Sequence, residues 1–377
     1  MLQKDFGKRS EAKMLKAYDT EVKILGLTFE NPILPASGPI VEGLENLLTL
    51  NALPLGGLVT KTISVKGAEV MKPCIVGTKN MVYNCELWSE LDHEIWIDIL
   101  KQVVAVKQKP LGISVGYTLA DFETIVPKLN PYADFFEVST HYNKLKLVDL
   151  VKCITSLTDK PVLMKTSPQS EGELQFVETV MSSGASGIVA FNSFGPGVVV
   201  DLKKRSVLIG TSEGNTWVSG PAIKPFVLKR IAMIREHFPE IPIIGCGGVD
   251  SAKDALEMIL AGADLVQMLS GALLKGRQNY EVVVNGLKQV MAENDISSIE
   301  SLRKTGLGLV ASGVGGLPEI DETLCIRCGI CAKVCPMMAY PQEKELPSVN
   351  PSKCMRCGLC ESLCPKSAIS GVLSIAR

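Results

Sequence analysis

Short apolar runs alternate along the chain with longer stretches in which apolar residues recur at helical spacing. Eight of these runs have the length of buried strands. Helical stretches lie between them, for example residues 93–109 and 224–238. Eight strands separated by helices predict an α/β fold of the (β/α)8 type, a TIM barrel. The eight runs are 33–38, 56–63, 110–117, 135–140, 161–167, 187–193, 242–248 and 265–271.

The segment before the first of these strands, VKILGLTFENPI from Val22, is apolar with a turn near its middle. We expect it to form a β-hairpin that closes the amino-terminal end of the barrel. At the opposite end, polar residues or glycines follow nearly every predicted strand, and in a barrel this end carries the active site. These residues are Ser37, Lys61, Ser114, Ser139, Lys165, Asn192, Gly247, Gly248 and Ser270.

The last two predicted strands end in GCGGVDS and QMLSGALLKG, and both run into helices. Glycines at such positions let backbone N–H groups and a helix start come close to an anion. The end of the barrel formed by these two strands is therefore the predicted phosphate site.

Length and charge restrict the classes of protein to consider. The 377 residues fit one large barrel and a small appended domain. The 39 basic and 40 acidic residues nearly cancel, so the charge favours neither nucleic acid nor an anionic membrane surface as a partner. The charged start has no apolar signal region, and no apolar run reaches the length of a membrane span. We therefore expect a cytoplasmic protein whose clustered cysteines bind metal.

Eight of the 12 cysteines form two repeats of C-x2-C-x2-C-x3-C-P near the end of the chain. Three thiolates on a tight loop hold three corners of a cubane cluster, and in bacterial two-cluster ferredoxins the fourth comes from the other repeat. A zinc ribbon would leave four of these cysteines unexplained, and the order of a radical-SAM motif is absent. The spacing therefore predicts two [4Fe–4S] clusters, one held by Cys325, Cys328, Cys331 and Cys364, the other by Cys354, Cys357, Cys360 and Cys335.

One further motif, GLGLVA from Gly306, matches a dinucleotide fingerprint but follows a helical stretch instead of a strand. We therefore do not interpret it as a nicotinamide site, and electrons from NAD(P)H would have to enter through another subunit. The expected organisation is an extension over residues 1–20, a barrel over 21–312 and a 2[4Fe–4S] ferredoxin domain over 313–377.

Several of these segments together resemble the dihydroorotate dehydrogenase superfamily: LTFENPILPASGP, TKTISVKG, PVLMKTSP, FNSFGPG and GCGGVDSAKDALEMILAGADLVQM. With the C-terminal cysteine repeats, the architecture is similar to the catalytic portion of dihydropyrimidine dehydrogenase. The resemblance implies FMN across the barrel mouth, with Ala36, Ser37, Lys61, Thr62 and Lys165 near the flavin. It also implies a phosphate site at Gly220, Gly247, Gly248, Ser270 and Gly271, and substrate contacts from Asn84, Asn192 and Ser193.

The fourth strand departs from the family pattern. Where the family has N-[LV]-S-[CS]-P-N, this chain reads EVSTHY from Glu137, so the usual Cys or Ser that transfers a proton is replaced. Thr140 takes its position, while His141 and Cys85 are the other candidates for this role. Because a carboxylate only accepts hydrogen bonds, Glu137 in place of Asn suggests a substrate with additional N–H groups or a positive charge. His93 and His237 are expected at the surface, and Trp88 either covers the pocket or anchors a loop.

The combined interpretation is an iron–sulfur flavoenzyme that reduces or oxidises a C=C or C=N bond of a small, nitrogen-containing heterocycle. The clusters would exchange electrons with an FAD/NAD(P)H subunit or a ferredoxin. Two alternatives stay open: a dihydroorotate dehydrogenase with Thr140 as base, and a non-catalytic electron-transfer or assembly subunit. The sequence leaves the oligomeric state open, a homodimer included.

Overall fold

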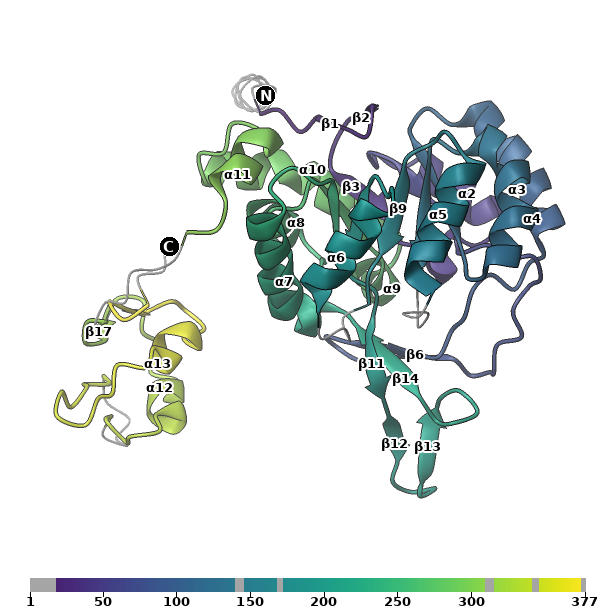
Figure 1. Ribbon diagram of the computed structural model, residues 1–377. Coiled ribbons are helices and arrows are strands. Elements are labelled where there is room, and N and C mark those ends of the chain that lie inside the picture. Colours follow the sequence, from purple (N-terminus) through teal and green to yellow (C-terminus); the bar gives the residue numbers. More distant parts are fainter. Residues whose placement is uncertain (1–17, 140–145, 168–171, 309–314, 341–345, 374–377) are drawn as a thin grey trace, which may run out of the picture. The chain divides into compact units, whose positions relative to one another are not determined.

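The computed structural model describes residues 18–139, 146–167, 172–308, 315–340 and 346–373 (Figure 1). The chain divides into two compact units, Met1–Leu307 and Gly308–Arg377. The predicted domain boundary after residue 312 lies outside the described residues. No helix in the described part of the chain is long and apolar enough to cross a membrane.

The first unit contains an eight-stranded sheet with the order β3-β16-β15-β10-β9-β8-β7-β4, in which every strand pair is parallel. Gly56 N–H donates to the Ile33 carbonyl oxygen (2.9 Å), which holds the segment before β4 beside β3 and brings the sheet close to closure. All eight predicted strands are present, and the predicted barrel is confirmed. The strands are β3 (Ile33–Pro35), β4 (Leu58–Val59), β7 (Leu111–Val115), β8 (Phe135–Ser139), β9 (Val162–Lys165), β10 (Gly187–Ala190), β15 (Ile243–Cys246) and β16 (Leu265–Met268).

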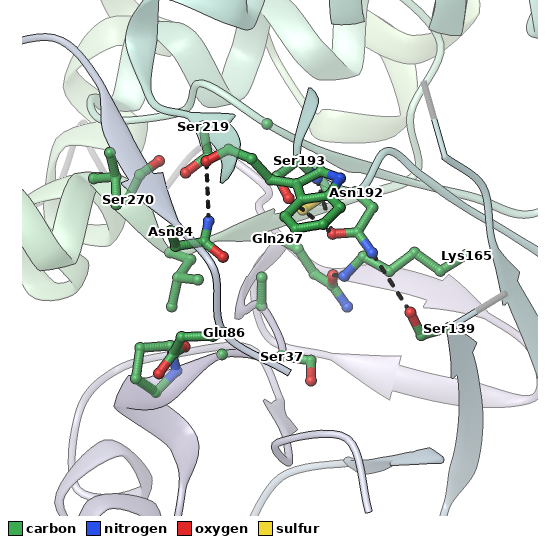
Figure 2. Close-up of a pocket in the computed structure, with 18 of the residues that line it drawn as sticks. Ser37, Asn84, Glu86, Ser139, Lys165, Asn192, Ser193, Ser219, Gln267 and Ser270 are labelled. Carbon is green, nitrogen blue, oxygen red and sulfur yellow. Dashed lines mark hydrogen bonds between the residues drawn. The ribbon is translucent and has the colours of Figure 1, made fainter. Parts of the chain in front are cut away.

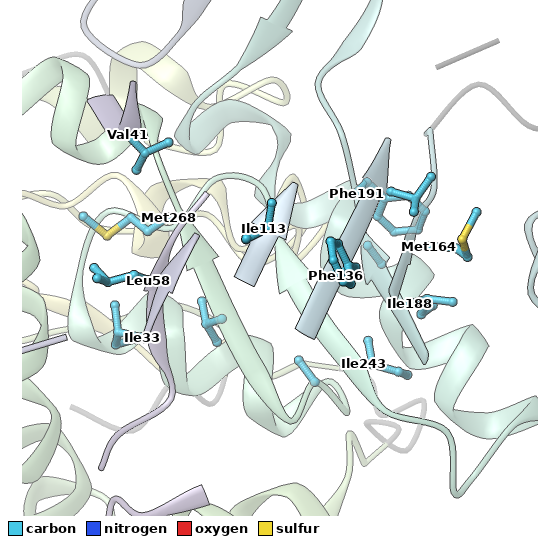
Figure 3. Close-up of a cluster of buried hydrophobic side chains, with 14 of the residues drawn as sticks. Ile33, Val41, Leu58, Ile113, Phe136, Met164, Ile188, Phe191, Ile243 and Met268 are labelled. Atoms are coloured by element: carbon cyan, nitrogen blue, oxygen red, sulfur yellow. The ribbon is translucent and has the colours of Figure 1, made fainter. Parts of the chain in front are cut away.

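Helices surround this sheet and bury one apolar face each against it. Their boundaries follow local sequence signals: α4 begins at a capping box formed by Thr118 and Asp121, and the Ser251 side chain caps α8. Figure 3 shows the apolar side chains that the strands contribute to this layer, among them Ile113 and Phe136. The helices are α2 (Leu44–Asn51), α3 (His93–Val106), α4 (Leu119–Leu129), α5 (Leu147–Leu157), α6 (Glu173–Ser182), α7 (Lys224–His237), α8 (Ala252–Leu260), α9 (Ser270–Lys275), α10 (Gln278–Glu293) and α11 (Ile299–Thr305).

The predicted hairpin is also present, with β1 (Val22–Ile24) paired antiparallel to β2 (Leu27–Phe29). Its apolar residues pack against a buried cluster to which the strands contribute Leu34, Val59, Leu163 and others. Since side chains alternate between the two faces of a strand, this cluster is the interior of the barrel and the helix-facing residues are the alternate set. The hairpin therefore closes the amino-terminal end of the barrel, as the sequence predicts.

A four-stranded antiparallel sheet, which we did not predict, lies beside the barrel with the order β11-β14-β6-β5. It joins two segments distant in sequence, because β6 (Val82–Asn84) pairs with β14 (Thr216–Ser219). The other two strands are β5 (Ile75–Gly77) and β11 (Phe194–Gly197). A ribbon of β12 (Val199–Asp201) and β13 (Ser206–Ile209) continues from it and extends away from the barrel (Figure 1). The sheet thus brings Asn84 and Trp217 to one place.

The second unit is built around the cysteine repeats. Strands β17 (Glu319–Ile320) and β18 (Ile369–Ser370) pair antiparallel, and each repeat contributes one short helix, α12 (Ile330–Val334) or α13 (Leu359–Ser362). The buried cluster of this unit consists of Cys331, Tyr340, Cys360 and Ile369, so cysteines make up half of it.

The expectation that His93 lies at the surface is wrong. Its side chain is buried at the first position of α3, where Nδ1 lies 3.0 Å from the Val65 carbonyl oxygen and Nε2 lies 2.9 Å from the Lys128 ammonium. The ring therefore joins the start of α3 to two neighbouring segments. His237, in contrast, is at the end of α7 and exposed, as expected.

Candidate functional site

A cavity of about 500 Å³ opens at the carboxyl ends of the barrel strands. Its volume lies in the usual range for small-molecule sites. Figure 2 shows polar side chains from several strands and loops around it. Residues predicted from the sequence that line it are Ala36, Ser37, Lys61, Thr62, Asn84, Glu137, Ser139, Lys165, Asn192, Ser193, Gly247, Gly248 and Ser270.

The residues at the floor of the cavity follow from the alternation of side chains between the two faces of each barrel strand. Phe135, Leu163 and Leu265 belong to the apolar cluster inside the barrel. Two residues further along each strand, the same face carries Glu137, Lys165 and Gln267. The three polar side chains therefore form a layer between the apolar cluster inside the barrel and the cavity.

Within this layer the three side chains are bonded to one another. The Lys165 ammonium donates to Glu137 Oε1 and to Gln267 Oε1, both at 3.0 Å. Gln267 Nε2 donates to the second carboxylate oxygen, Glu137 Oε2, at 2.5 Å. Both oxygens of the fully buried Glu137 are thus bonded within the chain. The carboxylate therefore holds Lys165 in place. The sequence, in which Glu137 replaces the Asn of the family pattern, did not indicate this role.

This layer keeps Lys165 positively charged. Burial by itself lowers the pKa of the Lys165 ammonium, but the negative charge of Glu137 and the hydrogen bond to it outweigh burial and raise the pKa above its ordinary value. Cys246 also lines the cavity, and burial raises the pKa of its thiol even though Lys165 acts in the opposite direction. At neutral pH, Lys165 is therefore a fixed cation and Cys246 a neutral thiol.

A second ion pair lies at the side of the cavity. Lys61 Nζ is 3.0 Å from Glu86 Oε2, and the two side chains are 5% and 13% exposed. Glu86 follows β6 in a loop, and the sequence analysis did not single it out. Among the described residues that line the cavity, the charged side chains are two lysines and two glutamates, Lys61, Lys165, Glu86 and Glu137. Their formal charges cancel.

The substrate-binding candidates are brought together from three parts of the chain. Asn84 Nδ2 donates to the Trp217 carbonyl oxygen (3.4 Å), which links β6 to β14. Asn192 Nδ2 donates to Ser139 Oγ (3.5 Å), and Asn192 Oδ1 accepts from the Ser193 backbone N–H (2.8 Å). The labelled amides of Asn84 and Asn192 both border the cavity in Figure 2.

Hydroxyl groups continue the polar lining on the side of β3 and β4. Ser37 Oγ lies 3.1 Å from Thr62 Oγ1, which in turn lies 2.9 Å from Ser114 Oγ. Trp88 borders the cavity and also anchors its loop, since its indole N–H donates to the Lys66 carbonyl oxygen (2.8 Å) and its ring packs on Tyr117. Both interpretations of Trp88 therefore apply.

The glycines predicted for a phosphate site fall into two groups. Gly247 (φ 128°) and Gly248 (φ 85°) line the cavity in a backbone conformation that other residues rarely adopt. Gly220 and Gly271 are not part of the lining. They lie where two backbones pack closely, because a Cβ at Gly271 would be 2.8 Å from the Val249 carbonyl oxygen and one at Gly220 would be 2.7 Å from that of Asn80. Gly248 shares this close packing, since a Cβ there would be 2.8 Å from the Lys224 backbone nitrogen.

The structure bears differently on the three proton-transfer candidates. Thr140 and His141 lie outside the described residues. Cys85 is buried, and its thiol lies 3.7 Å from the Cys74 carbonyl oxygen instead of lining the cavity. Burial, together with the nearby Cys74, raises the pKa of the Cys85 thiol. Because Asn84 faces the cavity and the next side chain points the other way, the geometry does not support Cys85 as a proton donor to a ligand there.

In the second unit, the eight repeat cysteines surround two small cavities. One is lined by Cys325, Cys328, Cys331 and Cys364, and Cys360 lines it as well. The other is lined by Cys335, Cys354, Cys357 and Cys360. In each cavity the fourth cysteine of one repeat joins the first three of the other, which is the exchange expected from the spacing.

Comparison with known proteins agrees with this geometry. The family model described as dihydroorotate dehydrogenase matches residues 19–291, and the model described as 4Fe-4S dicluster domain matches residues 317–365. The chain is similar to proteins named dihydroorotate dehydrogenase B (NAD(+)), catalytic subunit. The protein from Pyrococcus horikoshii is 29% identical over 300 residues, 75% of this chain and 96% of the relative.

Two further relatives carry the same name. The protein from Thermococcus kodakarensis is 28% identical over 305 residues, 76% of this chain and 97% of the relative. The one from Geotalea daltonii is 27% identical over 300 residues, 75% of this chain and 97% of the relative. The chain therefore belongs to the dihydroorotate dehydrogenase family of FMN-dependent oxidoreductases acting on CH–CH bonds, and a 4Fe-4S dicluster domain follows its barrel.

Proposed function

We propose that this chain is the catalytic subunit of an iron–sulfur flavoenzyme that reduces or oxidises a C=C or C=N bond in an uncharged, nitrogen-containing heterocycle. FMN would supply two-electron hydride transfer at the barrel mouth. Two [4Fe–4S] clusters would pass single electrons to or from a partner, either an FAD/NAD(P)H subunit or a ferredoxin. The observation that supports this most is one cavity with paired charges at the strand ends, in a chain that also carries two four-cysteine cavities.

The lining of the barrel cavity fits a flavin. Gly247 and Gly248 bring their backbone to the wall of the cavity, and Ser270 adds a hydroxyl group there, which together suit a phosphate. The fixed positive charge of Lys165 suits the electron-rich edge of a reduced flavin. Ala36 and Ser37 follow β3, across the barrel from Lys165 on β9, and would contact the flavin ring.

The charge of the cavity supports an uncharged substrate. A carboxylate buried in the cavity would need a cation, and both lysines of the described lining already hold a glutamate at 3.0 Å. An uncharged cyclic amide needs only hydrogen bonds, which Asn84, Asn192 and Ser193 can exchange with its N–H and C=O groups. Dihydroorotate, which carries a carboxylate, is the second candidate substrate, and the printed names of the relatives favour it.

The proton that accompanies hydride transfer would come from the segment that follows β8. We assign this role to Thr140, with His141 as the alternative. The two differ experimentally, because Thr140→Ala and His141→Ala should not lower turnover equally. Loss of the proton-transfer group should slow turnover about 100-fold or more, whereas loss of the other should not.

The first test is anaerobic purification followed by measurement of FMN and iron per chain. One FMN and about eight iron atoms are expected for this assignment. Iron without flavin would contradict the catalytic proposal and support an electron-transfer subunit.

The second test concerns the substrate. Orotate and uracil are titrated against the oxidised flavoprotein, and the flavin absorption band reports binding. We expect uracil, but not orotate, to perturb the wild-type flavin. Glu86→Gln removes the charge that pairs with Lys61 and should strengthen orotate binding about tenfold or more. Glu90→Gln is the matched control, since Glu90 lies in the same loop as Glu86 but pairs with the exposed Lys72. Wild-type oxidation of dihydroorotate would establish the second candidate instead.

A further inference from the structure

The two cysteine repeats are related by a constant offset, since each position of the first repeat has its counterpart 29 residues later, as in Cys325 and Cys354. The structure keeps this relationship in detail. Ala339 N–H donates to Cys335 Sγ (3.3 Å), and Ala368 N–H donates to Cys364 Sγ (3.2 Å). Each four-cysteine cavity therefore receives one equivalent backbone hydrogen bond to a sulfur atom.

The equivalence ends one residue further along each repeat. Tyr340 is buried, and its hydroxyl donates to Cys360 Sγ at 3.2 Å. The counterpart of Tyr340 is Ile369, equally buried, which lines the cavity that contains Cys331. An isoleucine side chain has no hydrogen-bond donor. Of the two sets of four cysteines, only the set that contains Cys360 therefore receives a side-chain hydroxyl at a cysteine sulfur from this position.

A hydrogen bond to a cluster thiolate changes the reduction potential of the cluster. Reduction adds negative charge that is shared with the sulfur ligands, so a donor at a sulfur stabilises the reduced state more than the oxidised state. The effect is large for a buried donor, because water does not screen it. Tyr340 meets this condition with an exposed fraction of 4%.

We propose that Tyr340 selectively raises the reduction potential of the cluster held by Cys335, Cys354, Cys357 and Cys360. This inference depends on the two clusters assigned under the proposed function. The cluster beside Tyr340 then holds an electron more readily than it would without the hydroxyl, and the two clusters are not interchangeable in the electron path.

Glu361, which follows Cys360 in the sequence, is another buried polar side chain of this unit. Its Oε2 accepts hydrogen bonds from the backbone N–H groups of Val372 (2.9 Å) and Leu373 (3.0 Å). Its negative charge opposes reduction of the nearby cluster, but it is unchanged when Tyr340 alone is altered. A comparison of wild type with Tyr340→Phe therefore isolates the hydroxyl group.

The test is a redox titration of the anaerobically purified full-length protein, followed by electron paramagnetic resonance. Tyr340→Phe keeps the ring and removes only the hydroxyl. We expect one of the two cluster transitions to move to lower potential and the other to stay in place. At the wild-type midpoint, the reduced-to-oxidised ratio of the affected cluster should fall about tenfold, equivalent to about 59 mV for one electron.

Ser362→Ala is the matched control, because this hydroxyl of the same unit donates to the Leu359 carbonyl oxygen instead of a sulfur atom. It should move neither transition. Equal shifts of both transitions, or none, in Tyr340→Phe would overturn the inference. Iron is measured in the same samples, so a protein without about eight iron atoms contradicts the proposed function itself, whereas a full iron content with unmoved potentials contradicts only the role of Tyr340.

Discussion

Glu137 shows how one replaced residue changes the surroundings of its neighbours. A fully buried carboxylate is tolerated only with partners, and here Lys165 and Gln267 occupy both of its oxygens. From the sequence, we expected the Glu137 carboxylate to accept hydrogen bonds from a substrate. In the structure it accepts them from Lys165 and Gln267 instead. The residue acts on the cavity through the position and charge of Lys165.

The substitution Glu137→Gln tests this role. It keeps the size of the side chain but leaves the Lys165 ammonium without its buried counter-charge, which costs about 3 kcal/mol of unfolding free energy. Denaturant unfolding followed by tryptophan fluorescence measures it, since all three tryptophans, at positions 88, 96 and 217, lie in the barrel unit. Glu90→Gln, at an exposed ion pair, should change stability by less than about 1 kcal/mol. A cost for Glu137→Gln no larger than that of the control would refute the role.

At the scale of single elements, the start of α4 depends on Asp121. Its carboxylate accepts hydrogen bonds from the Thr118 hydroxyl (2.8 Å), the Tyr117 N–H (3.1 Å) and the Ser64 hydroxyl (2.8 Å). Burial raises the pKa of this carboxyl, but these three bonds outweigh burial and hold the pKa below its ordinary value. The loop after β7 and the loop after β4 are thereby joined at one side chain.

The pH dependence follows from this direction. A carboxyl group whose pKa is lower in the folded state stabilises the fold above its unfolded value of 3.8 and loses this contribution as the pH falls through the folded value. Asp121→Asn should therefore destabilise the barrel by about 1 kcal/mol at pH 7. The difference from wild type should persist down to about pH 4 and shrink below it, measured by tryptophan fluorescence. A difference that grows on acidification would contradict the assignment.

The same scale shows what the sequence could and could not predict. The eight barrel strands were recognisable because each is an apolar run bounded by turn residues. Strands β5 and β6 were missed because their sheet forms only when β6 pairs with β14, which lies more than a hundred residues further along the chain. Gln267 sits inside an apolar run, and only the closed sheet shows that it faces Lys165. Glu86 lies in a loop, where a lone carboxylate carries no signal until Lys61 is seen beside it.

At the scale of the whole molecule, the two units are stabilised differently. The barrel unit has an extensive apolar core, whereas the buried cluster of the second unit has four residues, two of them cysteines. A core this small rarely supports a fold without staples such as metal clusters. The second unit should therefore depend on the iron bound to its cysteines.

Removal of iron by a chelator tests this dependence. We expect limited proteolysis to cleave first within residues 308–377 after iron is removed, because metal binding and folding are coupled in small metal-binding domains. The iron-loaded protein, digested in parallel, should resist cleavage there. Equal resistance with and without iron would show that the apolar contacts of the unit suffice.

The cancelled charges of the barrel cavity have a kinetic consequence. The described part of the lining, with two positive and two negative side chains, exerts little long-range pull on a diffusing molecule. Capture of a heterocycle should then depend on short-range contacts made after arrival, and the association rate should hardly change between low and high ionic strength. The rate of substrate capture should then depend on the local substrate concentration, because the electrostatic field of the cavity does not attract the substrate.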